Sequence, residues 1–303
     1  MTPRPLLSVI LPSYNNGTCL PATIRRIRQT CPKNTEVIIV MDGSTDETSR
    51  ILARFLSGHP RVLVVARKTR RGKGAAVRNG VHVAHGRYIA TIDADMAIDP
   101  SYVAQGLAWL QQAPALDIVI ARRTAYRTSL VRHIAHAVFH WIEWTLFRMP
   151  YHDTQAPMKI FRAPVAKAVF AHMQTRSYAF DIEVLFRTMI RGHGVGELPV
   201  LQRKTQSNLR WNLLLFTAIE LLRMYRTYVV HQLICLLHRQ RRHLCRIGIL
   251  SLRHIILWPL SWPVLWILQL LYHLQNKQIP VHSPILPTTF IKAPILVQGK
   301  RLS

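Results

Sequence analysis

The stretch YIATIDADMAIDP, residues 88–100, runs from an apolar, β-branched segment directly into three carboxylates, Asp93, Asp95 and Asp99. The chain has only 14 Asp and Glu residues against 40 Lys and Arg residues, so a cluster of acids needs an explanation. In an extended segment, Asp93 and Asp95 point to the same side, where their charges repel unless a cation or hydrogen-bond donors compensate. The stretch is therefore either an ordinary acidic turn or a site for a hard divalent cation. We expect a site for Mg²⁺ or Mn²⁺.

Apolar runs and helix-length stretches alternate on both sides of this segment. Strands are predicted at 6–12, 36–42, 61–67, 88–95 and 117–123, and helices at 18–30, 45–57, 73–84 and 100–113. Near-continuous apolar strands separated by helices are typical of a parallel sheet that is covered on both faces. We predict an α/β fold with a Rossmann-like, doubly wound, mostly parallel sheet.

Polar segments follow the first four predicted strands: PSYNNG, DGSTDET, RKTRRGKG and DADMAIDP. Because parallel strands end at one edge of a sheet, these loops should share a rim, where such sheets bind ligands. Asp42 at this rim can accept a hydrogen bond from a nucleobase. The basic loop at 70–80 suits a diphosphate through Lys73, Arg78 and the following helix N-terminus, although a solvated basic turn explains the loop equally well.

A second group of polar residues lies among apolar neighbours in YHDTQAPMKIF and SYAFDIEVLF. It comprises Asp153, Gln155, Asp181 and Glu183. These residues either belong to the same site or form ion pairs with nearby arginines. We expect them to belong to the site, because the chain has few acids to place.

The net charge of +26 is concentrated in residues 121–303, which hold 25 of the 40 basic residues and 6 of the 14 acidic ones. Such an excess favours a polyanionic partner, either nucleic acid or an anionic membrane surface. Residues 209–246 are apolar with Arg and His spaced along them, as in basic helices that lie on a membrane surface. No DNA- or RNA-binding pattern accompanies the charge, so we expect no nucleic acid partner.

The segment 247–277 is strongly apolar and includes a run without charge at 255–272. It is predicted to be a transmembrane or re-entrant segment, with a buried core helix as the alternative. The basic cluster just upstream places that side in the cytoplasm. Residues 278–303 are expected to form an irregular tail.

The segments SVILPSYNN, VIIVMDGSTDET, RGKGAAVRNGVHVAHGRYIATIDADM, DTQAPMKIF and AFDIEVLF, in this order and spacing, resemble the family-2 glycosyltransferases of GT-A fold. The resemblance covers residues 6–230 and is nearest to the polyprenyl-phosphate branch, more to its glucose-transferring than to its mannose-transferring members. It implies a GT-A catalytic domain at 1–208, followed by the membrane-associated helices.

The resemblance also implies site residues. Donor-binding residues are expected at Pro12, Tyr14, Asp42, Lys73, Arg78 and Asp93. Catalytic residues are expected at Asp95, Asp153, Gln155 and Asp181. Asp93 and Asp95 would hold Mg²⁺ or Mn²⁺. Contacts with the acceptor phosphate are expected from Arg123, Arg132 and Ser207.

The implied reaction is an inverting, metal-dependent transfer of a hexose, with glucose favoured, from a nucleoside diphosphate sugar to a polyprenyl phosphate such as dolichyl or undecaprenyl phosphate. Two alternatives stay open: mannosyl transfer from GDP-mannose, or a polysaccharide or glycolipid acceptor. The expected partners are UDP-glucose or GDP-mannose, polyprenyl phosphate and membrane lipid. The enzyme is expected to associate with the membrane, with its catalytic domain on the cytoplasmic face. A catalytically inactive scaffold of the same fold is disfavoured by the presence of the acidic site residues.

Overall fold

The computed structural model describes residues 4–56, 61–124, 140, 143–202, 217 and 219–229, and the backbone of two short strands at 295–297 and 300–301. The chain divides into two compact units, one formed by residues 1–217 and 286–303 and the other by residues 218–285. In the second unit the described part is a helix at 219–229. No helix within the described ranges has both the length and the apolar character that crossing a bilayer requires.

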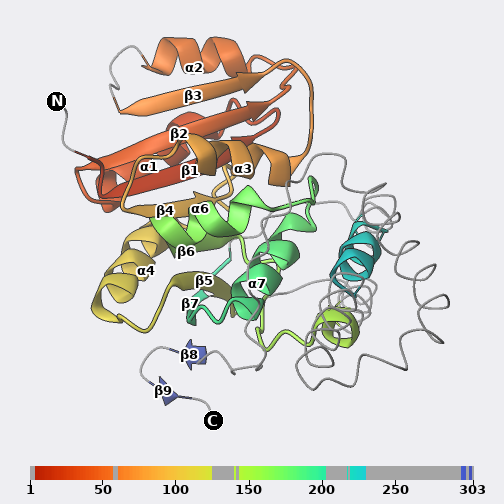
Figure 1. Cartoon of the computed structure of the whole chain (residues 1–303). Coiled ribbons are helices and arrows are strands. Elements are labelled where there is room, and N and C mark those ends of the chain that lie inside the picture. Colours follow the sequence, from red (N-terminus) through yellow and green to blue (C-terminus); the bar gives the residue numbers. More distant parts are fainter. Residues whose placement is uncertain are drawn as a thin grey trace, which may run out of the picture. The chain divides into compact units, whose positions relative to one another are not determined.

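The first unit is built on one mixed sheet (Figure 1). Its main strands are β1 (Leu7–Ser13), β2 (Thr35–Asp42), β3 (Val62–Arg67), β4 (Tyr88–Ile92), β5 (Ile118–Arg123), β6 (Met158–Arg162) and β7 (Val195–Val200). The short strands β8 (Ile295–Val297) and β9 (Lys300–Arg301) follow at one edge, so that the strand order is β3-β2-β1-β4-β6-β5-β7-β8-β9.

The helices are α1 (Leu20–Thr30), α2 (Thr48–Leu56), α3 (Lys73–Val83), α4 (Ser101–Gln112), α6 (Ala163–Ala171) and α7 (Phe180–Ile190). Each of the first four follows a strand, as the alternating pattern predicts. The mostly parallel α/β sheet is therefore confirmed, with boundaries that differ from the predicted ones by a few residues.

The antiparallel strand β6 is the main departure from the predicted parallel sheet. It lies between β4 and β5 and runs antiparallel to both, with Thr91 opposite Lys159 and Ile92 opposite Met158. Because of this reversal, the start of β6 lies at the same edge as the carboxyl ends of β4 and β5. The sequence pattern does not predict this strand, because a lysine in the middle of a short apolar run is atypical of a buried strand.

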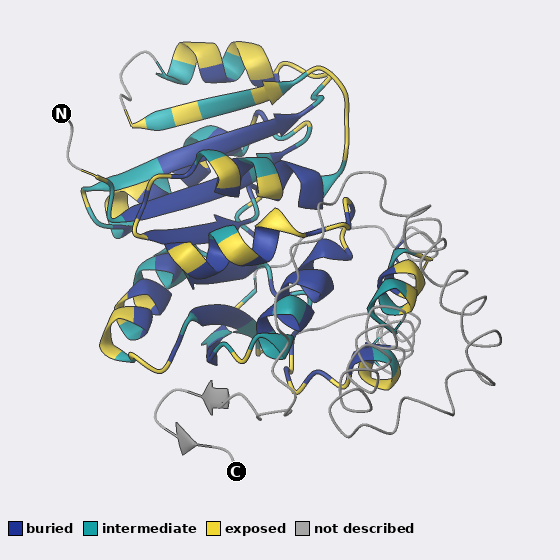
Figure 2. Ribbon diagram, in the orientation of Figure 1, coloured by how far each residue is buried: buried dark blue, intermediate teal, exposed yellow. Residues whose placement is uncertain are grey.

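Side chains alternate between the two faces of the central strands. Leu7, Val9 and Leu11 join a core with residues of α1 and α4, whereas Ile10 faces Gly80 of α3. Both faces of β1 and β2 are thus covered, and Figure 2 shows these strands as mostly buried. This two-sided burial explains why β1, β2 and β4 are apolar almost without interruption.

Several sequence predictions concern residues outside the described ranges. They include Arg132 and Ser207, the segment 247–277, and most of 209–246 and 278–303. The predicted domain boundaries and the membrane association of the C-terminal part stay predictions.

The close approach of α3 to β1 is testable at Gly80. A Cβ at this position would lie 2.5 Å from Cγ2 of Ile10, a fully buried side chain. We expect Gly80→Val to lower the free energy of unfolding by roughly 3 kcal/mol, because the core cannot accept the added atoms without rearranging. Urea unfolding followed by circular dichroism measures this loss.

The matched control is His82→Val, which adds the same β-branched residue at an exposed position of the same helix. Equal losses for both variants would contradict a close contact at Gly80.

Candidate active site

The predicted rim exists at the carboxyl edge of the sheet. In the parallel register Ser13 pairs with Met41, and Asp42 pairs with Arg67, so the ends of β1, β2 and β3 lie together. Strand β4 ends beside β1 at Ile92. The loops that follow these strands carry the polar residues singled out in the sequence.

Asp42 organises the loop that joins β3 to α3. Its carboxylate accepts hydrogen bonds from the backbone N–H of Arg71 at 2.9 Å and of Gly72 at 2.6 Å, and from the Arg67 side chain at 3.3 Å. Gly72 has a φ of 102°, and a Cβ there would lie 2.3 Å from the carbonyl oxygen of Arg176. Only glycine fits this position without strain. The geometry thus gives Asp42 a role in ordering this loop. Its contact with a nucleobase stays a prediction.

The other predicted base-pocket residues lie at the end of β1. Pro12 is in the strand and pairs with Val40, and Tyr14 follows the strand. The guanidinium of Arg70 lies 4.0 Å from the centre of the Tyr14 ring, so the β1 and β3 loops are in contact. A cation over an aromatic face is favourable by about 1 kcal/mol.

Asp93 and Asp95 lie in the turn directly after β4, because the strand ends at Ile92 and not at Asp95. Lys73, the first residue of α3, places its ammonium 2.6 Å from Oδ1 of Asp93. One oxygen of Asp95 accepts a hydrogen bond from the N–H of Ala97 at 3.0 Å. The structure thus brings together three predicted residues, two from the turn after β4 and one from the start of α3.

The surroundings of Asp95 compensate its negative charge only in part. Although part of its side chain is exposed, desolvation at the rim raises the pKa of Asp95. The negative charge of Asp93 raises it further, and the hydrogen bond from Ala97 opposes both effects. For Lys73, burial lowers the pKa, but Asp93 and Asp181 outweigh it and leave the ammonium firmly charged.

These donors suit a magnesium or manganese ion. Each aspartate has one carboxylate oxygen for which no protein hydrogen bond or ion pair is found in the described part of the chain. The described residues contain no cluster of three or more His, Cys, Asp or Glu side chains that would enclose a metal by themselves. A site with two carboxylates is typical of Mg²⁺, which keeps several waters and takes substrate phosphates as further ligands. Asp93 and Asp95 therefore fit the expected ion.

The third carboxylate of the opening segment, Asp99, has a structural role. It binds the Arg26 side chain through both oxygens and accepts a hydrogen bond from the N–H of Ser101 at 2.8 Å, at the start of α4. Burial raises the pKa of Asp99, but the bonds from Ser101 and Arg26 outweigh it and lower the value to about 2. Asp99 thus ties α1 to α4 and is not a candidate ligand.

A buried ion pair between Lys159 and Asp181 lies behind this rim, and its lysine is not among the predicted site residues. The Lys159 side chain is 1% exposed, and its ammonium bonds to Asp181 and to the carbonyl oxygen of Ala156 at 2.7 Å. Burial raises the pKa of Asp181 and lowers that of Lys159, so each shifts toward its neutral form. The ammonium groups of Lys159 and Lys73 each lie 5.6 Å from the centre of the Phe180 ring. Phe180 therefore links the pair to the Asp93 side of the site.

Three successive residues before β6 are each held by a different part of the fold. The backbone N–H of His152 donates to Glu197 of β7 at 2.8 Å. Asp153 forms a two-bond ion pair with Arg123 of β5, at 2.7 and 2.8 Å. The hydroxyl of Thr154 donates to Glu143 at 2.6 Å. We name residues 152–155 the clamped segment.

Two predicted residues with different expected roles, Asp153 and Arg123, thus bind each other. Glu183 pairs with Arg187 at 2.7 Å and accepts hydrogen bonds from the backbone N–H groups of Gln174 and Thr175. Of the two possibilities given for these acids, an ion pair with a nearby arginine is therefore found for Asp153 and for Glu183. Asp181 pairs with a lysine instead.

Gln155 and Arg78 are the remaining predicted residues in the described ranges. Gln155 ends the clamped segment and is partly buried. Arg78 donates to the carbonyl oxygen of Met173 at 3.0 Å, toward the segment after α6, whereas Lys73 points to the carboxylates. The structure does not bring Arg78 and Lys73 to the same partner.

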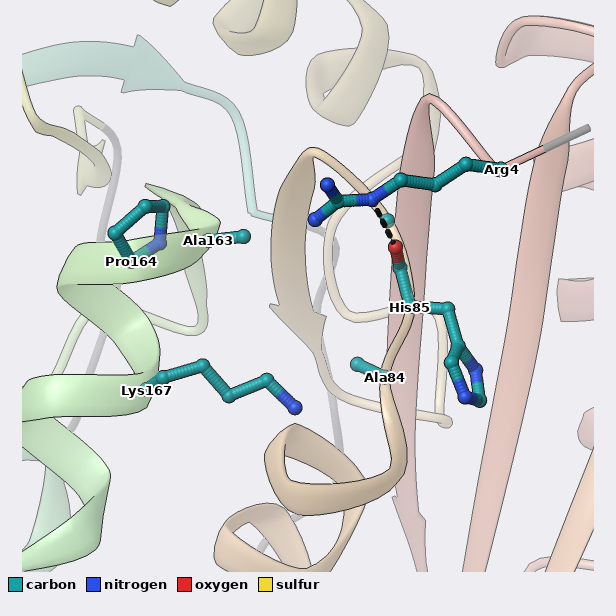
Figure 3. A pocket seen from close by; sticks show the side chains of 7 residues that line it. Arg4, Ala84, His85, Ala163, Pro164 and Lys167 are labelled. Atoms are coloured by element: carbon teal, nitrogen blue, oxygen red, sulfur yellow. Dashed lines mark hydrogen bonds between the residues drawn. The ribbon is translucent and has the colours of Figure 1, made fainter.

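A pocket with a volume of about 380 Å³ lies away from this rim (Figure 3). Its lining includes Arg4, His85 and Lys167, near the amino ends of β1 and β4. Arg4 donates a hydrogen bond to the carbonyl oxygen of His85 at 2.9 Å. Lys167 donates to the carbonyl oxygen of His82, in the last turn of α3, at 2.7 Å. Its cations thus satisfy backbone carbonyls at a helix end, a structural role.

Comparison with known proteins agrees with the mostly parallel α/β fold. The Glycosyl transferase family 2 profile matches residues 8–170, more than half of the 303-residue chain. The chain belongs to glycosyl transferase family 2.

Relatives of this family 2 chain include the dolichyl-phosphate beta-glucosyltransferases of Mus musculus and Homo sapiens. The mouse protein is 32% identical over 210 residues, which are 61% of this chain and 63% of the mouse protein. The human protein is 31% identical over 224 residues, covering 66% of this chain and 68% of the human protein. The chain thus spans 63% of the mouse relative's length.

The fold is shared with solved structures of Mycobacterium tuberculosis glucosyl-3-phosphoglycerate synthase. One has a TM-score of 0.54 at 18% identity, covering 76% of this chain and 80% of that one. Another, crystallised with Mn²⁺, uridine-diphosphate and phosphoglyceric acid, has a TM-score of 0.56 at 17% identity, covering 76% and 78%. This likeness concerns the fold alone.

The buried pair is testable by a double-mutant cycle. We expect Lys159→Met to lower the free energy of unfolding by roughly 3–5 kcal/mol, because it leaves Asp181 buried without its cation. Adding Asp181→Asn removes the stranded charge and should restore part of that loss. Urea unfolding of both single variants and the double variant gives the coupling energy.

Lys33→Met is the matched control, because Lys33 is exposed. This control should change the free energy of unfolding by less than about 0.5 kcal/mol. A double variant no more stable than Lys159→Met would contradict the pairing.

Proposed function

We propose that this family 2 glycosyltransferase transfers glucose from UDP-glucose to dolichyl phosphate or a similar polyprenyl phosphate, with inversion at the anomeric carbon. One observation carries the proposal. Asp93 and Asp95 follow strand β4, and its neighbour β6 is preceded by the clamped segment with Asp153 and Gln155. A donor diphosphate and a phosphorylated acceptor can therefore meet between adjacent strands.

The donor side combines the two carboxylates with basic groups. When bound, Mg²⁺ or Mn²⁺ held by Asp93 and Asp95 would neutralise charge on the leaving diphosphate. Lys73 supplies a permanent positive charge next to Asp93, within reach of the same phosphates. Tyr14 and Arg70 offer a flat surface for the nucleobase at the end of β1.

The acceptor side favours positioning over proton transfer. A phosphate monoester has a second pKa of about 6, so the acceptor is largely a dianion at neutral pH and does not need a general base. Asp153 is engaged by Arg123, and Asp181 by Lys159, so neither carboxylate offers itself as a base. Holding reactants in place can remove roughly 7–11 kcal/mol from the barrier. We assign Asp153, Gln155 and Arg123 to this task.

The choice of glucose and of a prenyl acceptor draws on the relatives, which are named for dolichyl phosphate and glucose. The mycobacterial structural neighbour was crystallised with Mn²⁺ and uridine-diphosphate, in line with a metal-assisted reaction of a uridine nucleotide. The basic, apolar C-terminal part suits an anionic membrane surface on the cytoplasmic side. We propose that it brings the site to its lipid acceptor, and that nucleic acid is not a partner.

A donor screen tests the proposal. The full chain, with Mn²⁺ and a short dolichyl phosphate, is given UDP-glucose or GDP-mannose, and the lipid product is read by mass spectrometry. We expect a hexose added from UDP-glucose at least about tenfold faster than from GDP-mannose. Faster transfer from GDP-mannose would replace glucose by mannose. No transfer from either donor would refute a prenyl-phosphate hexosyltransferase.

The metal assignment is tested at Asp95. We expect Asp95→Ala to lower the transfer rate at least about a hundredfold and to weaken Mn²⁺ binding, measured by electron paramagnetic resonance, with unchanged circular dichroism. Asp117→Asn is the control, because Asp117 lies just before β5 and pairs with His193 at 2.8 Å, away from the rim. Near-normal transfer by Asp95→Ala in excess Mn²⁺ would contradict the assignment.

A further inference from the structure

Glu143 is a buried carboxyl group that neither the sequence motifs nor the proposed reaction uses. It is 1% exposed and lies in a helical stretch, described at 143–147. Its Oε2 atom accepts the hydroxyl hydrogen of Thr154, a residue that is itself only 3% exposed. Thr154 lies between Asp153 and Gln155, so Glu143 is one hydrogen bond away from the proposed acceptor residues.

Glu143 differs from the other buried acids of this region in its charge partners. Asp153 has Arg123 and Asp181 has Lys159, but within the described ranges no lysine or arginine pairs with Glu143. Its Oε1 atom is buried and makes no hydrogen bond with any described residue. An ionised carboxylate in this position would therefore be poorly compensated.

The titratable groups that face Glu143 come from three parts of the fold. His140, on its own helical segment, has Nδ1 at 3.4 Å from Oε2 and carries charge only when protonated. Asp153 of the clamped segment and Asp181 of α7 contribute negative charge. Burial raises the pKa of Glu143 to about 7; the two aspartates add to this and the bond from Thr154 opposes it. The carboxyl group thus changes its protonation state near neutral pH.

We propose that Glu143 is a positioning residue that acts through Thr154 on the clamped segment, and that loss of its proton loosens this segment. Neutral Glu143 accepts the Thr154 hydroxyl and leaves the ion pair between Asp153 and Arg123 undisturbed. Ionised Glu143 repels Asp153 and requires water around Oε1, which the packed surroundings admit only by opening. The inference rests on the proposed function, because the clamped segment is assigned there to the acceptor.

The first test is the pH dependence of kcat/KM for the dolichyl phosphate acceptor between pH 5.5 and 9. Ionisation of the acceptor raises the rate near pH 6 in every variant and serves as an internal reference. In the unmodified chain we expect a fall of about fivefold between pH 7 and pH 8, as for one essential proton with a pKa near 7. Glu143→Gln accepts the same hydrogen bond but cannot ionise, so its rate should change less than about twofold over that range.

Three further variants sharpen the test. Thr154→Val removes the hydrogen bond through which Glu143 acts, so its rate, like that of Glu143→Gln, should change less than about twofold between pH 7 and pH 8. Glu47→Gln, an exposed acid of the α2 region that pairs with Arg50, should keep the original profile. His140→Gln should also keep it. Loss of the alkaline fall in His140→Gln would assign the proton to His140 and overturn the proposal. An unchanged alkaline fall in Glu143→Gln would also overturn it.

A readout without catalysis separates this proposal from the proposed function. Hydrogen exchange is measured on peptides covering residues 150–156 and corrected for intrinsic rates. Between pH 6 and pH 8, protection of these peptides should fall at least about threefold in the unmodified chain and less than about twofold in Glu143→Gln. If the chain transfers no hexose to a prenyl phosphate, the proposed function fails, and this comparison still decides on Glu143. Equal changes in both proteins would overturn the positioning role.

Discussion

The structure at the rim depends on the compensation of charges that the fold removes from water. Lys159 is the clearest case, because its ammonium is fully buried in the middle of a strand and pairs with Asp181. Removing one partner of such a pair leaves an isolated charge in a poorly solvated place, which costs far more than the pair contributes. Phe180 and Lys73 extend this arrangement to Asp93, so the two sides of the site share one electrostatic environment.

The reversed strand β6 brings the two groups of candidate site residues together. Its antiparallel direction places the start of β6 beside the end of β4, so that the clamped segment lies near Asp93 and Asp95, the proposed metal ligands. In a fully parallel sheet the residues before β6 would lie at the opposite edge. One change of strand direction therefore brings the proposed donor and acceptor residues to one place.

The site is rich in charge yet offers few free acids for proton transfer. Asp42 orders a loop, Asp99 joins two helices, and Asp153 and Asp181 are held in ion pairs. Such a site suits a reaction whose nucleophile is already charged and in which geometry supplies most of the advantage. Glu143, with which no lysine or arginine of the described residues pairs, differs from these acids, and burial raises its pKa to about 7.

The sequence by itself determined the alternation of strands and helices, since apolar runs and their spacing are local properties that residues 7–13, 35–42 and 88–92 display directly. It also determined that polar loops meet at one edge, because this follows from parallel strand direction alone. Tertiary structure decided the partners of the charges: Arg26 meets Asp99 across 73 positions, Arg123 meets Asp153 across 30, and Lys159 meets Asp181 across 22. It also decided that Glu143 is buried with no lysine or arginine partner among the described residues. A local sequence pattern does not predict such long-range contacts, because they form only when the strands have their final order and direction.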